Sequence, residues 1–339
     1  MFFNAYIIRV TILPNFSLDF PYAYGQPDAT ADFRVEPSDF QVYEQLGFEP
    51  CGEGEHVYLQ VEKIGENTAW VAEKIAELAQ VLVIDVGYCG RKDRHAITTQ
   101  WFSIYLPKVD IEPDWMALNS DSIVVLQVTR HLRKLRRGDH ELNKFVIRLR
   151  NLGVVAEKAF EQKINQIFAQ GVPNYFGEQR FGRNANNLPE AHALLVDGRR
   201  VRDKQKRGLF LSAARSYLFN QVLAARVAMG NWQTLLEGEP ESVPTAPLWG
   251  RGRSAASGEA FAAENLVVAQ WAQWCDGLEH AGLKQERRAL SLKPSAATWR
   301  WLDVEIELTF SLASGEFATT ILRELVVLQT AIKTESGSV

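Results

Sequence analysis

The sequence predicts an α/β fold, in the broad sense that includes α+β proteins, because stretches of strand periodicity alternate with stretches of helical periodicity. Apolar and polar residues alternate from His56 to Glu62, which is typical of a half-buried strand. Val71, Ile75 and Leu78 then recur at helical spacing, and Ser122 to Thr129 is rich in β-branched residues. With 339 residues, of which 46% are hydrophobic, the chain is long enough for more than one core, and we expect two domains.

Residues 1–165 supply most of the expected sheet. Phe33 to Glu44 has the pattern of a strand, a turn and a second strand, with the turn at residues 37–39. The helix that begins after Asn67 leads to the apolar run 81–84, which we expect to be a strand. Thr98 to Leu106 follows as a further strand.

The sequence changes character near residue 166. An amphipathic helix pattern over residues 156–170 stops at Gly171-Val172-Pro173. Helix-forming stretches then surround a segment rich in glycine, proline and serine at residues 238–258. We therefore expect an inserted domain over residues 166–294.

The chain then returns to the first domain over residues 295–339. Apolar residues alternate from Val304 to Leu312, which predicts a strand, and a helix pattern runs from Ala318 to Leu328. This return segment is expected to complete the sheet.

The segment Gly87 to Ser103, GYCGRKDRHAITTQWFS, has the most unusual chemistry in the chain. Its first two glycines allow the backbone to turn sharply. Asp93 lies in a cationic and polar cluster at residues 91–95, and neighbouring cations favour the ionised form of a carboxylate. An ionised aspartate suits a nucleophile better than a proton donor. The alternative is an ordinary charged turn at the surface.

The formal net charge of −4 hides two concentrations of positive charge. Residues 130–150 contain eight lysines and arginines against two acidic residues, and residues 199–207 contain six against one. Such patches allow an acidic protein to follow a phosphate backbone, and we expect Arg133 and Arg136 to make such contacts. The alternative is a solvated surface without a partner.

The three cysteines, Cys51, Cys89 and Cys275, are far apart and show no metal-binding spacing. We therefore expect a reducing compartment and no structural zinc. The N-terminal run MFFNAYIIRVTIL has no basic residues before its apolar part and is too short to span a bilayer. We expect a cytoplasmic protein without a membrane segment.

The loop around Asp93 resembles the nucleophile motif of the TruD family of tRNA pseudouridine synthases, with the pattern G-x-x-G-x-K-D-x-H-A-x-T-x-Q. Other segments resemble the family in the same order along the chain. They are PSDFQV at 37–42, the run 136–145 ending in Asn-x-Phe, PNYFGEQRFG at 173–182, SAARS at 212–216, and FATTILREL at 317–325. The resemblance covers roughly residues 30–326.

This resemblance implies the pseudouridine synthase fold, a mixed and mostly antiparallel sheet flanked by helices. It also implies an enzyme, an isomerase that converts uridine 13 of tRNA to pseudouridine. The reaction involves no redox change, so no cofactor and no metal are expected. We expect a monomer whose partner is tRNA.

The resemblance implies a role for particular side chains. Asp93 is the expected nucleophile at the bottom of a basic, aromatic-lined groove, with Arg34 or Lys92 as its positive partner. Four residues are expected to contact the flipped nucleotide: Phe40, Asn143, Phe145 and Phe317.

Each aromatic residue has an alternative role in packing. Residues 143–150 alternate, so Asn143 and Phe145 point the same way and could hydrogen-bond and stack against a uracil, or Phe145 could simply join the core. Phe317 could equally pack at the start of the last helix. In the loop at 173–182, Arg180 is expected to contact RNA, or else the loop is a structural hinge.

Two other functions are compatible with these residues. The first is a non-catalytic tRNA-binding or RNA-folding protein that uses the same basic and aromatic surface. The second is a glycosidic hydrolase, which normally needs paired carboxylates; Glu36 and Glu44 are the acids that distance along the chain does not exclude.

Overall fold

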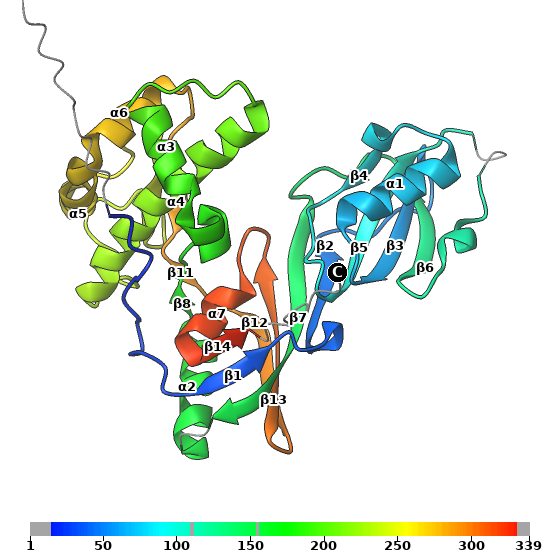
Figure 1. The fold of residues 1–339 in the computed structure, drawn as a ribbon, viewed down its shortest axis with the longest axis horizontal. Helices are drawn as coiled ribbons and strands as arrows, with labels where there is room; N and C mark the ends of the chain where they lie inside the picture. The colour runs from blue at the N-terminus through cyan, green and yellow to red at the C-terminus, as the bar shows by residue number, and fades with distance from the viewer. Residues whose placement is uncertain (1–14, 109–111, 154–155, 331–339) are drawn as a thin grey trace, which may run out of the picture. The chain divides into compact units, whose positions relative to one another are not determined.

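The computed structural model describes residues 15–108, 112–153 and 156–330, and the chain folds into two compact units (Figure 1). Unit 1 combines the chain up to Gly25 with Pro173–Ser291, and unit 2 combines Gln26–Val172 with the chain from Leu292 onward. The apolar run at residues 1–14 lies outside the described residues. In the part of the chain that is described, no helix is long and apolar enough to cross a bilayer.

Unit 2 is built on a sheet of ten strands. The order β12-β13-β7-β2-β5-β3-β6 forms its main path, while β1 pairs with β7 and β14, and β4 pairs with β5. Parallel pairing occurs between β1 and β14 and between β2 and β5, and the other pairs of this sheet are antiparallel. The expected mixed, mostly antiparallel sheet is therefore confirmed. The strands are β1 (Thr30–Phe33), β2 (Phe40–Leu46), β3 (His56–Ile64), β4 (Val86–Tyr88), β5 (Ile97–Tyr105), β6 (Ile123–His131), β7 (His140–Gly153), β12 (Ser295–Leu302), β13 (Glu305–Ala313) and β14 (Val327–Thr330).

Among the described residues of unit 2, three α-helices occur: α1 (Thr68–Ala79), α2 (Glu157–Gln170) and α7 (Ala318–Leu325). Helix α1 packs on the sheet through the predicted apolar stripe, since Val71 and Ile75 are buried in one cluster with Leu59 of β3 and Phe102 of β5. The helix ends at Ala79, and the following residue, Gln80, caps it in a left-handed conformation with a φ of 53°.

Two predicted elements need correction. The apolar run 81–84 is not a strand: a 3₁₀ turn covers Val83–Asp85, and the side chains of Leu82 and Ile84 are 71% and 77% exposed. The strand β4 starts two residues after this run, because the chain must first turn out of α1. The last helix also ends earlier than predicted, at Leu325, because Val327–Thr330 forms β14.

Unit 1 is mostly helical, with α3 (Asn187–Leu195), α4 (Lys204–Ala228), α5 (Gly258–Val268) and α6 (Ala272–His280), and a small antiparallel pair of β9 (Thr245–Leu248) and β10 (Glu286–Ala289). Residues 15–25 join it through aromatic contacts, with Phe16 5.4 Å from Trp274 and Phe20 5.2 Å from Tyr175 between ring centroids. The sequence had not indicated this role for the N-terminal segment. The family-specific domain at 166–294 stays a prediction; all of α2, in which its first boundary falls, lies in unit 2.

The sheet of unit 2 is interrupted at two places that matter for the site. Strands β1 and β2 both pair with β7, and the chain leaves the sheet between Phe33, opposite Leu149, and Phe40, opposite Ile147. Strands β2 and β4 both pair with β5: β2 does so at residues 97–99 and β4 at residues 102–104. The first interruption carries Arg34, and the second opens a gap between β2 and β5 that polar side chains fill.

A buried ion pair fixes the first interruption. Asp39, which is 0% exposed, accepts hydrogen bonds from Arg150 Nε at 2.9 Å and Nη2 at 2.7 Å, and from the backbone N–H of Glu36 at 2.9 Å. Arg150 belongs to β7, so this pair ties the excursion at 34–39 to the middle of the sheet.

We predict that Asp39→Asn lowers the free energy of unfolding by about 3 kcal/mol, because it leaves the Arg150 guanidinium without its buried counter-ion. Urea titration measures the change. The matched control is Glu36→Gln: its side chain is 58% exposed and also lies 2.9 Å from Arg150, so its loss should cost less than about 1 kcal/mol. Equal effects of the two substitutions would contradict this account.

Candidate active site

Asp93 and Arg34 form an ion pair at the surface of unit 2. Arg34 Nη2 lies 3.2 Å from Asp93 Oδ2, with side-chain exposures of 20% for Arg34 and 42% for Asp93. Arg34 comes directly after β1 and has a φ of 59°, a left-handed conformation that is rare for residues other than glycine. Its guanidinium carbon lies 4.1 Å from the ring centre of Phe40. The segment between β1 and β2 thus places the guanidinium of Arg34 beside the Asp93 loop.

The expected position of Asp93 at the bottom of a basic, aromatic-lined groove stays a prediction. With 42% of its side chain exposed, the carboxylate lies at the surface of the loop. The loop connects β4 and β5. Its backbone groups and the side chain of Lys92 make the contacts that hold it, so the carboxylate of Asp93 stays outside the packed interior.

Lys92 points away from Asp93. Its Nζ lies 2.7 Å from Glu44 Oε2 and donates a hydrogen bond to Asn143 Oδ1 at 2.6 Å. The side chains of Lys92 and Glu44 are 7% and 0% exposed, so this is a buried ion pair. Of the two expected partners of Asp93, Arg34 pairs with it, whereas Lys92 pairs with Glu44.

Three further hydrogen bonds hold the loop. The backbone N–H of Lys92 donates to Thr68 Oγ1 at 3.0 Å, at the start of α1. Lys63 Nζ donates to the backbone carbonyl of Asp93 at 2.9 Å, and the backbone N–H of Gly138 donates to the carbonyl of Cys89 at 2.8 Å. The loop is therefore fixed on both sides of Asp93.

Lys63 is an unusual anchor because its side chain is fully buried. Burial lowers the pKa of Lys63 to about 8, and the nearby charge of Asp93 opposes this shift.

A cluster of buried polar groups fills the gap between β2 and β5. Glu44 Oε1 accepts a hydrogen bond from the backbone N–H of Trp101 at 3.0 Å, two residues beyond the last β2–β5 pair. Asn143 Nδ2 lies 3.0 Å from His140 Nε2. Burial and the charge of Lys92 lower the pKa of His140, which keeps its imidazole neutral.

Glu44, Cys89 and His140 offer ligand atoms within 4.8 Å of one another, a spacing that a metal ion could use. However, the ammonium of Lys92 already lies 2.7 Å from the carboxylate of Glu44. Burial also raises the pKa of the Cys89 thiol, which opposes the thiolate that zinc requires. We assign no metal to this cluster.

Glu44 and Lys63 were not recognised as anchors from the sequence, although a signal was present. Glu44 follows Phe40 and Val42 at every second position of one strand, and Lys63 follows Val57, Leu59 and Val61 in the same way. A charged residue in the row of a strand that faces the core must find a buried partner.

The aromatic residues expected to stack on the base lie in the core of unit 2. Phe40 is 2% exposed and Phe145 is 7% exposed, and their ring centres are 5.9 Å apart. Phe145 also packs against Phe310 of β13 at 5.7 Å. In this conformation the ring of Phe40 supports the guanidinium of Arg34.

Phe317 is half-buried at the N-terminal end of α7, and its carbonyl accepts the backbone N–H of Thr320. The loop before it leaves β13 at Ala313, which pairs with Leu142, next to Asn143. Phe317 therefore follows the end of β13 that pairs with the part of β7 around Asn143.

The expected RNA-binding arginines differ in exposure. Arg133 and Arg136 are exposed on the turn between β6 and β7, and Arg133 pairs with Asp139 at 2.7 Å. Arg180, in unit 1, is half-buried: its Nη1 lies 3.2 Å from Ser212 Oγ, and its guanidinium carbon lies 5.3 Å from the Phe176 ring centre.

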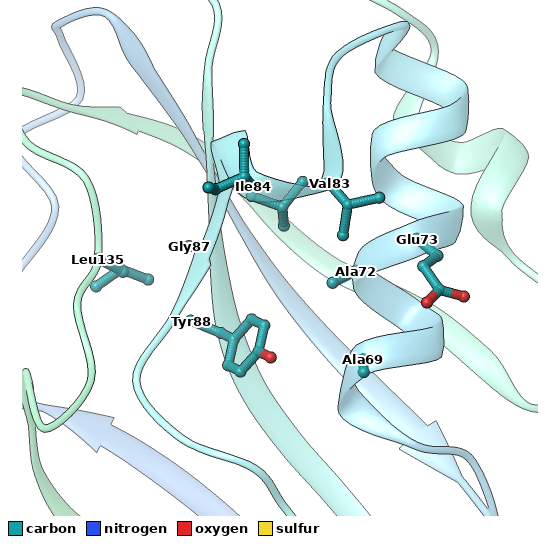
Figure 2. Close-up of a pocket in the computed structure, with 9 residues that line it drawn as sticks. Ala69, Ala72, Glu73, Val83, Ile84, Gly87, Tyr88 and Leu135 are labelled. Carbon is teal, nitrogen blue, oxygen red and sulfur yellow. The ribbon is translucent and has the colours of Figure 1, made fainter. Parts of the chain in front are cut away.

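A pocket of about 310 Å³ lies beside the start of the loop, between α1 and the chain entering β4 (Figure 2). Its walls are mostly apolar, and the polar groups on the labelled side chains are the Tyr88 hydroxyl and the Glu73 carboxylate. Its lining does not include Asp93 or Arg34. The residues lining it are Ala69, Ala72, Glu73, Val83, Ile84, Val86, Gly87, Tyr88 and Leu135.

Comparison with known proteins shows the family of this chain. A family model described as tRNA pseudouridine synthase D (TruD) matches residues 19–199. A tRNA pseudouridine synthase D from Cellvibrio japonicus (strain Ueda107) is 58% identical over 320 residues, covering 94% of this chain and 95% of that protein. Another from Methylococcus capsulatus is 48% identical, covering 91% of this chain and 94% of that protein.

A solved structure supports the same fold. The crystal structure of the putative tRNA pseudouridine synthase D from Methanosarcina mazei aligns with a TM-score of 0.66 at 20% identity, covering 90% of this chain and 95% of that chain. The fold is therefore of the α+β class that this structure represents, as the sequence predicted. The chain belongs to the TruD family of tRNA pseudouridine synthases.

The buried amine of Lys63 predicts a pH dependence of stability. Its pKa is lower in the folded protein, at about 8, than the ordinary value of 10.5, so the unfolded chain binds more protons between these values. Stability contributed through Lys63 should therefore increase as the pH rises from about 8 towards 10.5.

We predict that the difference in unfolding free energy between the wild type and Lys63→Met shifts in favour of the wild type by about 1–2 kcal/mol from pH 7.5 to pH 9.5. Urea titrations at each pH measure this difference, which cancels the other titrating groups. A difference that does not change with pH would show that Lys63 titrates near its ordinary pKa in the folded protein.

Proposed function

We propose that this protein isomerises uridine 13 of tRNA to pseudouridine, with Asp93 as the nucleophile. The observation that carries the proposal is an accessible carboxylate held 3.2 Å from a guanidinium, on a loop fixed by buried contacts. The ion pair engages Asp93 Oδ2 and 42% of the side chain is exposed, so the carboxylate is accessible to a substrate. Family membership supports the reaction class.

The chemistry requires little beyond this carboxylate. The bond between N1 of uracil and C1′ of ribose breaks, the base turns, and a bond forms between C5 and C1′. The proton lost from C5 is balanced by the proton gained at N1, so no oxidant, reductant or cofactor enters the reaction. Asp93 attacks either the base or the sugar, and an ionised carboxylate serves both routes.

Arg34 supplies the electrostatic environment. Its guanidinium lies 3.2 Å from Asp93 Oδ2, and its position over Phe40 fixes the planar group. We propose that Phe40 and Phe145 form the apolar support of this pair and that the target base stacks near them. Extrusion of a base from its helix costs on the order of a few kcal/mol, which contacts in the site must offset.

Asn143 and Phe317 complete the proposed substrate site. The amide of Asn143 already contacts Lys92 and His140, so we assign it to reading the base only if one of these contacts opens. Phe317, half-buried at the same end of β13, is the aromatic ring more accessible to a nucleotide.

The basic patches are proposed to bind the tRNA backbone. Arg133 and Arg136 are exposed and lie on the turn that follows β6, as phosphate contacts require. We expect Arg180 to contribute less to tRNA binding, because its guanidinium already contacts Ser212 and Phe176 within unit 1. We expect the protein to act as a monomer in the cytoplasm, without a cofactor or metal.

Two alternatives differ in their use of carboxylates. A glycosidic hydrolase would need a second free acid beside Asp93. Glu44 is bound by Lys92 and by the backbone of Trp101, and Glu36 pairs with Arg150, which disfavours both candidates. A non-catalytic tRNA-binding protein remains the second candidate, since the exposed arginines serve either function.

We predict that Asp93→Asn abolishes product formation and leaves the affinity for tRNA within about threefold of the wild type, because the amide cannot act as the nucleophile. Purified protein is incubated with an unmodified tRNA transcript, and pseudouridine at position 13 is detected by a chemical stop in reverse transcription. A filter-binding assay gives the affinity. If the wild-type protein forms no pseudouridine on any tRNA transcript but binds them, the binding function is favoured.

We also predict that Arg34→Ala lowers the single-turnover rate by about a hundredfold, since removal of a preorganised charge at an active site typically has an effect of this size. Arg34→Lys should recover only part of the rate, because an ammonium lacks the planar face that stacks on Phe40. Equal rates for the wild type and Arg34→Ala would exclude Arg34 as the partner of the nucleophile.

A further inference from the structure

We propose that Glu44 is a positioning residue that keeps the ammonium group of Lys92 away from the carboxylate of Asp93. The inference rests on the proposed function, in which Asp93 must remain free to attack. It concerns a side chain that does not contact the reacting atoms and acts through its neighbour.

The geometry gives Lys92 two partners in the gap between β2 and β5. Glu44 Oε2 lies 2.7 Å from Lys92 Nζ, and Asn143 Oδ1 lies 2.6 Å from it. Glu44 itself cannot turn away easily, because its other oxygen accepts the backbone N–H of Trp101 at 3.0 Å. The carboxylate is thus fixed by the sheet and in turn fixes the lysine.

Without Glu44, the ammonium of Lys92 would be buried beside neutral groups. Asn143 and the neutral imidazole of His140 offer dipoles but no negative charge, and the buried amine of Lys63 repels it when protonated. Asp93 is the adjacent residue, and its negative charge would then attract the ammonium of Lys92.

Adjacent residues can form such a pair in this chain. Arg323 and Glu324 are neighbours in sequence, and Arg323 Nη1 lies 2.8 Å from Glu324 Oε1. A second cation on Asp93 would compete with Arg34 for the carboxylate and cover part of its exposed surface. The nucleophile would be present but less available.

The burial of the pair supports a role other than stability. Two charges removed from water rarely stabilise a fold more than apolar side chains of the same volume would. The side chains of Glu44 and Lys92 are both almost fully buried, and Lys92 belongs to the loop that carries the proposed nucleophile, Asp93. We infer that the function of the Glu44–Lys92 pair is to keep Lys92 apart from Asp93.

A crystal structure of Glu44→Gln tests the inference directly. We expect Lys92 Nζ within about 4 Å of the Asp93 carboxylate, with the ion pair between Arg34 and Asp93 lengthened or broken. If Lys92 stays beside residue 44 and Asn143, the inference is overturned. Because this measurement reads the ion pairs and not the product, it separates failure of the inference from failure of the proposed function.

Rates provide the second test. We expect Glu44→Gln to lower the single-turnover rate at least tenfold with tRNA affinity unchanged, and Glu44→Gln combined with Lys92→Met to return the rate to within about threefold of the wild type, because the competing cation is gone. A purely structural role would lower the thermal midpoint and leave the rate of the folded protein unchanged.

The matched control is Glu77→Gln, which removes a glutamate paired with a lysine, Lys74, at 2.9 Å on the exposed face of α1. This variant should keep the wild-type rate. If Glu44→Gln does not fold, the double variant still decides the question, since it removes both charges and should fold. A folded double variant with less than a tenth of the wild-type rate would show that Lys92 itself is needed and would overturn the inference.

Discussion

The buried ion pair between Glu44 and Lys92 is the interaction on which the rest of this site depends. Strands β2 and β5 pair over three residues each and then separate, which leaves the backbone N–H of Trp101 without a strand partner. Glu44 satisfies that N–H with one oxygen and binds Lys92 with the other. The same carboxylate therefore satisfies a backbone group at the gap in the sheet and holds Lys92 of the Asp93 loop.

Two groups of charges in unit 2 have different tasks. Asp39 and Glu44 are buried; Asp39 pairs with Arg150 of β7 and Glu44 pairs with Lys92 of the Asp93 loop, and each lies where the chain departs from regular pairing. Asp93 and Arg34 are brought together by those departures and remain accessible. Buried pairs are costly to break, whereas an exposed pair is weak and easily rearranged. Such a division keeps the scaffold rigid while the nucleophile stays available to a substrate.

Periodicity predicted the α/β class, whereas the mixed sheet was implied by the resemblance to the TruD family, which rests on specific motifs such as the loop that carries Asp93. The sequence did not distinguish Arg34 from Lys92 as the partner of Asp93, since that depends on a sheet interruption that no local pattern reveals. The buried position of Phe40 was an open alternative for the same reason. Glu44 could have been found, because it occupies the core-facing row of its strand. The apolar run 81–84 was mistaken for a strand because four residues are too few to show a period.

The most direct measurement is a crystal structure of the Asp93→Asn variant bound to an unmodified tRNA transcript. The account predicts that the target uridine is extruded from its helix, with its base or ribose within about 4 Å of the residue 93 side chain, and that Lys92 remains beside Glu44. A target uridine that stays stacked in the tRNA, or that binds away from residue 93, would contradict the account.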